Sequence, residues 1–126
     1  MKAVEVILWA SDGYDGANWE STLKISDSDY SQFIKLAKEY EFDKSEIDYS
    51  FDPNQYAVME YEDYTNYLCD NAPGIYGRLM KKATKLIAES FDANKDRVDY
   101  MEYDIDNFNI GYYIKLEWLV QIIENR

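Results

Sequence analysis

The sequence predicts a single α+β domain, and three observations lead to this prediction. Two strand-like stretches separated by a turn open the chain over residues 4–25. Two helical patterns follow at about 28–40 and 75–91, and shorter strand-like stretches lie between and after them without regular alternation. A length of 126 residues suffices for one hydrophobic core. We therefore expect one domain over residues 1–126, with an antiparallel or mixed sheet packed against the two helices.

The N-terminal strands are predicted from residue type and alternation. Val4–Ala10 is rich in β-branched and aromatic residues, and Trp19–Ile25 alternates apolar with polar side chains. The intervening segment Ser11–Asn18 contains Gly, Asp and Asn, which favour turns. Together these patterns predict a β-hairpin.

Both helices are predicted from apolar periodicity. The first follows Ser26, whose hydroxyl can cap it, and has the carboxylates of Asp27 and Asp29 in its first turn. The second follows Pro73-Gly74 and carries apolar side chains on one side and cations on another. Its apolar residues are Ile75, Leu79, Ala83, Leu86 and Ile87, and its cations are Arg78, Lys81, Lys82 and Lys85.

Two segments fit both a strand and a helix. Residues 55–61 read as a strand, although Asp52 as a cap and Pro53 at the first position would also start a helix. Residues 112–118 alternate as a strand does and lead into one or two helical turns at 119–125, while one helix from 112 onward also fits. A short helix is expected at 63–70 and a further strand at 98–103.

Composition excludes several classes of function. The chain has no histidine, which excludes Ser-His-Asp and Cys-His catalysis, and its single cysteine, Cys69, cannot form an internal disulfide. No apolar stretch is long enough to span a bilayer. No glycine-rich phosphate loop or distinctive carboxylate pair stands out. We expect a cytoplasmic protein that is not an enzyme, binds no cofactor and does not associate with membranes.

Charge gives the positive indication. The chain carries 25 acidic and 13 basic residues, a net charge of −12, which disfavours direct binding to nucleic-acid phosphates and favours a basic protein partner. The acids are densest over residues 39–70, where ten acidic residues and one lysine give −9. Tyrosines interleave these acids and would supply contact area at low cost in side-chain entropy.

These features predict a small acidic inhibitor, of the immunity or anti-defence type. It would occupy a basic surface of a nuclease or nucleic-acid-binding protein, with its carboxylates in place of phosphates. The expected partner-binding residues come from the acidic segment and from the hairpin loop: Glu46, Asp48, Tyr49, Asp52, Tyr56, Glu60, Tyr61, Glu62, Asp63, Tyr64 and Tyr67, with Asp12, Tyr14 and Asp15. The oligomeric state is left open.

Two alternatives remain, a calcium-binding module and a small enzyme that uses carboxylates. Residues 91–102 resemble an EF-hand calcium loop, and this resemblance implies ligands at Asp92, Asn94, Asp96 and Glu102. The segment departs from the EF-hand pattern because Arg97 stands where that loop needs glycine. Moreover, Glu102 reaches the bidentate position only if one residue is deleted. We therefore predict no metal site and keep calcium binding as an alternative function.

Overall fold

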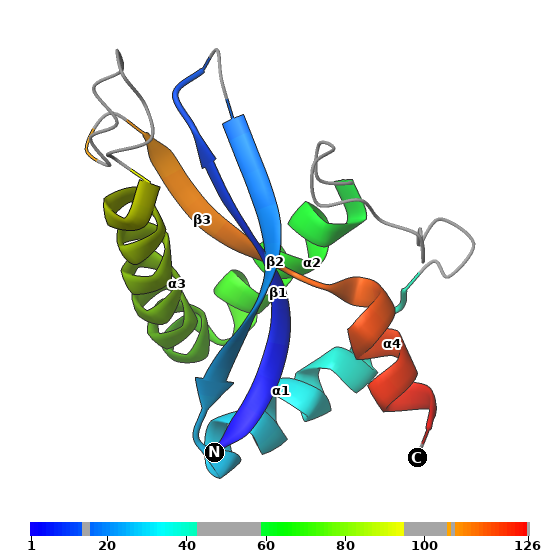
Figure 1. The fold of residues 1–126 in the computed structure, drawn as a ribbon. Coiled ribbons are helices and arrows are strands. Elements are labelled where there is room, and N and C mark those ends of the chain that lie inside the picture. The colour runs from blue at the N-terminus through cyan, green and yellow to red at the C-terminus, as the bar shows by residue number, and fades with distance from the viewer. Residues whose placement is uncertain (14–15, 43–58, 95–105, 107, 126) are drawn as a thin grey trace.

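The computed structural model describes residues 1–13, 16–42, 59–94, 106 and 108–125. Strands β1 (Lys2–Ser11) and β2 (Gly16–Ile25) form an N-terminal hairpin, and β3 (Asn109–Ile114) pairs with the other side of β1. Both pairings are antiparallel and give the strand order β2-β1-β3 (Figure 1). The predicted α+β class and N-terminal hairpin are confirmed.

Helices α1 (Asp27–Glu39), α2 (Met59–Asn71), α3 (Pro73–Asn94) and α4 (Leu116–Glu124) complete the described part of the fold. Helix α1 begins as expected, because the hydroxyl of Ser26 accepts a hydrogen bond from the backbone N–H of Asp29 at 3.1 Å. The two main helices lie close to their predicted bounds, and α3 extends three residues further, from 91 to 94.

The strand prediction for 55–61 is wrong where the structure describes that segment. Residues 59–61 form the start of α2, while 55–58 lie outside the described residues. Tyr61, Tyr64 and Leu68 are all buried, and their spacing of three and four residues places them on one side of a helix. The short helix predicted at 63–70 is confirmed as part of α2.

The C-terminal prediction is half right. Strand β3 ends at Ile114, and α4 begins at Leu116, so residues 116–118 are helical and not part of a strand that continues to 118. Leu116, Leu119 and Val120 are buried, and helical spacing brings them together on one face. The strand predicted at 98–103 lies outside the described residues.

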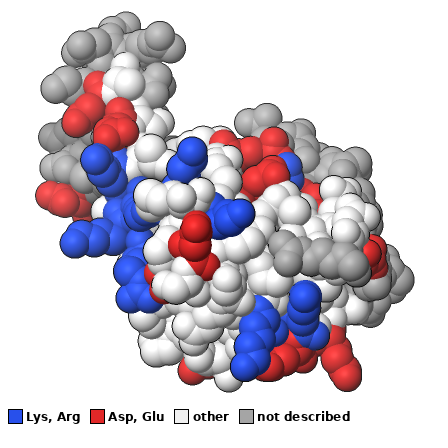
Figure 2. Space-filling view, turned by 90° about the horizontal axis from the view of Figure 1, so that it is seen from below, with Lys and Arg blue, Asp and Glu red and all other residues white. Residues whose placement is uncertain are grey.

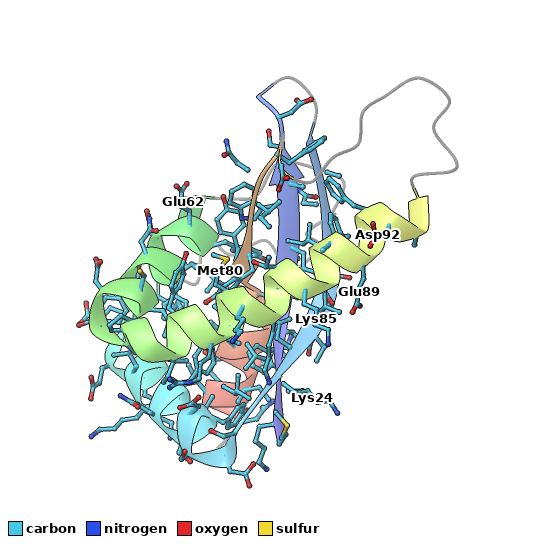
Figure 3. The ribbon with its side chains drawn as sticks, turned by 90° about the vertical axis from the view of Figure 1, so that its left-hand side faces the viewer. Lys24, Glu62, Met80, Lys85, Glu89 and Asp92 are labelled. Carbon is cyan, nitrogen blue, oxygen red and sulfur yellow. The ribbon has the colours of Figure 1, made fainter. Side chains whose placement is uncertain are left out.

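The hydrophobic core lies between one face of the sheet and the helices. Val4, Val6, Leu8 and Ala10 alternate along β1 and are all buried on this face. Helix α3 contacts all three strands and lies across the sheet in the view of Figure 3. Helix α2 covers the edge of β3, where the hydroxyl of Thr65 accepts a hydrogen bond from the backbone N–H of Ile114 at 3.2 Å.

The opposite face of the sheet holds a close contact between Trp9 and Gly111. These residues are register partners on β1 and β3, and the indole of Trp9 also stacks on Tyr113 with ring centroids 5.8 Å apart. A Cβ atom at Gly111 would lie 2.6 Å from Cζ2 of Trp9. Glycine is therefore needed at 111 for the indole to lie flat on β3.

Replacement of Gly111 by Ala is expected to lower the free energy of unfolding by about 1–3 kcal/mol, because the indole must shift to admit the methyl group. Urea denaturation followed by tryptophan fluorescence measures this loss. Gly77→Ala is the matched control. A Cβ atom at Gly77, within α3, meets no atom within 4 Å, so this change should stabilise the protein by up to about 1 kcal/mol. Equal stability of the Gly111→Ala variant and the wild type would contradict the contact.

Candidate protein-binding surface

A cluster of aromatic side chains joins the end of α1 to α2. The ring of Tyr40 lies 4.8 Å from that of Tyr67 and 5.2 Å from that of Tyr64, while Phe42 lies 5.1 Å from Tyr64 (centroid distances). Tyr64 is fully buried, whereas Tyr40, Phe42 and Tyr67 are half-buried. Three aromatic side chains therefore combine a fixed position with partial exposure to solvent.

Exposed carboxylates neighbour these half-buried rings, along α2 and in the sequence around Tyr40. Asp63 and Asp70 are exposed and lie four residues before and three residues after Tyr67, on the same side of α2. Glu39 and Glu41 are exposed on either side of Tyr40 in the sequence. We call this surface the acidic–aromatic face; it comprises Glu39, Tyr40, Glu41, Phe42, Asp63, Tyr67 and Asp70.

None of the four acids of this face forms an ion pair with a described residue. Asp70 also lies in the last turn of α2, where the helix dipole disfavours a negative charge. The last turn of α2 contains no basic residue that would offset this cost. A cationic group brought by a partner would therefore meet a negative potential that no cation among the described residues offsets through an ion pair.

Two cations of α3, Arg78 and Lys82, are engaged elsewhere. Arg78 donates two hydrogen bonds to Asp29 of α1, from Nε to Oδ2 at 2.7 Å and from Nη2 to Oδ1 at 2.8 Å. The hydrogen bonds and positive charge of this guanidinium lower the pKa of Asp29 below its usual range. Lys82 donates to the backbone carbonyl of Lys24 at the end of β2. On the face that Figure 2 shows, lysine and arginine side chains lie in separate groups with acidic side chains among them.

The predicted partner-binding residues fall into four groups, one of which is the buried pair Tyr61 and Tyr64. Two of the predicted residues are exposed on α2, Glu62 and Asp63, and Figure 3 shows Glu62 near the start of that helix. Two others are half-buried, Tyr67 of α2 and Asp12 after β1. Only the backbone of Glu60 is described, within α2. The remaining polar residues lie outside the described part of the chain: Glu46, Asp48, Tyr49, Asp52, Tyr56, Tyr14 and Asp15.

Tyr61 and Tyr64 have a different place from the one expected of contact residues. Both are fully buried, so their side chains support the fold and do not reach a partner. The hydroxyl of Tyr61 donates a hydrogen bond to Glu117 of α4. Conversely, sequence reasoning did not select the stretch from Glu39 to Phe42, although its strict alternation of acid and aromatic residue was a usable signal.

The proposed calcium ligands are only partly placed. Asp92 is exposed near the end of α3 and Asn94 is its last residue, while Asp96 and Glu102 lie outside the described residues. Within the described ranges, no group of three or more Cys, Asp or Glu side chains is arranged to hold a metal ion.

Of the helices in the described ranges, none is both long enough and apolar enough to cross a membrane. Comparisons with known protein families, with curated proteins and with solved structures found no match.

Proposed function

We propose that this protein is a small inhibitor that binds a basic protein through the acidic–aromatic face. The observation that carries the proposal is a set of three half-buried rings with four exposed carboxylates on neighbouring residues, none of them paired with a described cation. The partner class is a nuclease or a nucleic-acid-binding protein, whose basic groove is the surface that such an array of charges fits. This is the mode of action of an immunity or anti-defence protein.

The two components of the face have different tasks in this mechanism. The carboxylates attract a basic partner over distance, speed the encounter and exclude acidic competitors. Tyr67 and Tyr40 then supply contact area. Their rings already pack against each other and against Tyr64, so little side-chain entropy is lost on binding. Inhibition requires only that the bound protein cover the groove, so no catalytic group is needed.

The partner is found by retaining it on the immobilised protein from host lysate at low salt and eluting with a salt gradient. A true partner must then lose its binding to nucleic acid as the inhibitor is added, in proportion to the amount bound. A partner that binds the inhibitor and its nucleic acid at the same time would refute the proposed occupation of a basic groove.

Neutralising two acids of the face tests the role of its charge. Asp63→Asn with Asp70→Asn should weaken binding by about tenfold and reduce the dependence of the affinity on salt. The matched control is Ser31→Lys with Gln32→Lys, two exposed positions on α1, because both double variants change the net charge from −12 to −10. Isothermal titration calorimetry with the purified partner measures the affinity of each double variant at low and at high salt. An equal loss in the two variants would show that only net charge matters, which the proposal excludes.

A further inference from the structure

The two edges of the sheet differ in how their backbone groups are satisfied. On β3, Thr65 of α2 covers the edge by accepting the outward N–H of Ile114. On β2, the outward groups belong to Glu20, Thr22 and Lys24. The backbone N–H of Lys115 donates to the carbonyl of Glu5, so the backbone N–H and C=O of Glu5 point towards β3. Thr22 is the register partner of Glu5 on β2, and its backbone N–H and C=O therefore point away from β1.

Part of this β2 edge has no partner among the described residues. Lys82 donates a hydrogen bond to the carbonyl of Lys24, which confirms the outward direction of that group and leaves its second lone pair for another donor. The outward backbone groups of Glu20 and Thr22 receive no such contact from any described residue. An edge strand with free N–H and C=O groups is a template for pairing with another strand.

The side chains along this edge are complementary to their own copy. Glu20, Thr22 and Lys24 alternate on the same face of β2 and are all exposed. A two-fold axis through Thr22 would pair β2 with β2 of a second copy in antiparallel orientation and place Glu20 opposite Lys24, twice. Oppositely charged cross-strand neighbours stabilise a sheet, and the registers centred on Glu20 or on Lys24 would instead place like charges opposite each other.

The charges of α3 follow the same symmetry. Lys82 contacts Lys24 near one end of β2, and along α3 the exposed side chains change from Lys85 to Glu89 and Asp92 towards the other end (Figure 3). In Figure 1, α3 and β2 run in opposite directions along the sheet. The same two-fold axis would therefore bring the basic part of one α3 towards the acidic part of the other.

We propose that two copies of this chain pair through their β2 edges and form one continuous six-stranded antiparallel sheet. The net charge of −12 on each copy opposes association. At physiological ionic strength, however, screening acts beyond roughly 8 Å, so the paired charges at the edge outweigh the distant repulsion. The acidic–aromatic face comes from the end of α1, the three residues that follow it and α2. The paired edge is β2, so the dimer uses no residue of that face.

Sedimentation equilibrium over a micromolar to millimolar concentration series tests the dimer. The expected mass rises from 14.9 kDa towards twice that value. Thr22→Pro should abolish the rise, because proline removes an N–H that points outward and that β1 does not use. Thr22→Val keeps this N–H and should dimerise as the wild type does. A constant mass of 14.9 kDa, or a dimer that survives Thr22→Pro, overturns the proposal.

A charge exchange tests the register. Lys24→Glu should weaken dimerisation by about tenfold, because it replaces two attractive cross-strand pairs by two repulsive ones. Adding Glu20→Lys to this variant restores opposite signs and should recover the dimer. Circular dichroism confirms the fold of each variant first, because Glu20 also forms an ion pair with Lys115 through Oε1. Failure of a folded double variant to dimerise would overturn the axis at Thr22.

Discussion

Replacement of Lys115 by Met is expected to lower the free energy of unfolding by about 2–3 kcal/mol. The Lys115 side chain is 18% exposed and forms ion pairs with Glu20 of β2, with Glu5 of β1 at 3.9 Å and with Glu117 of α4 at 3.9 Å. Glu117 is 7% exposed and accepts a hydrogen bond from the buried hydroxyl of Tyr61. Without the ammonium group, three carboxylates share one site and the buried one loses its counter-charge.

The loss is expected to be smaller than that of a fully buried ion pair, because water still reaches Glu5 and Glu20. Urea denaturation of the Lys115→Met variant gives its size. Adding Glu117→Gln removes the buried charge and should restore at least about 1 kcal/mol, whereas adding Glu89→Gln, an exposed change on α3, should restore none. Wild-type stability in Lys115→Met would show that this lysine does not hold the carboxylates together.

The elements that could be predicted are those whose local pattern allows one interpretation. The hairpin has two alternating strands around a turn, and α3 has a long apolar stripe with cations opposite. The starts of α2 and α4 could not be fixed in this way, because short apolar runs fit a helix and a strand equally well. Tertiary contacts decide them: Thr65 covers the β3 edge at Ile114, and Tyr61 reaches Glu117.

The candidate site was predictable in charge but not in detail. The acidic density over residues 39–70 identified the region, and Asp63 and Tyr67 do lie at the surface. Tyr64 and Tyr67 lie in the same acidic and aromatic stretch of sequence. Their positions around the axis of α2 differ, however, so Tyr64 is buried and Tyr67 is half-exposed. The packing of Tyr40 on Tyr67 depends on how α1 meets α2, which a sequence pattern does not specify.

Alkaline pH is expected to unfold the protein cooperatively above about pH 10. Tyr64 and Tyr112 are buried, and burial raises the pKa of both phenols above the usual value of 10.0. The hydroxyl of Tyr112 also donates to the carbonyl of Tyr76 at 3.0 Å, a hydrogen bond that the phenolate could not make. The folded protein therefore retains these two protons at pH values where the unfolded chain releases them.

The sign of the pH effect follows from proton linkage. Below pH 10 both states keep the tyrosine protons, so these groups cause no loss; above it the unfolded state binds fewer protons, and stability falls as pH rises. Each of Tyr64 and Tyr112 contributes a loss of about 1.4 kcal/mol per pH unit in this range. Tyrosinate absorbance and far-ultraviolet circular dichroism, recorded together, should show late ionisation that coincides with unfolding. Tyr64→Phe should make the decline less steep by one tyrosine's share. Ionisation of all tyrosines while the circular dichroism stayed native would contradict the prediction that burial raises the pKa of Tyr64 and Tyr112.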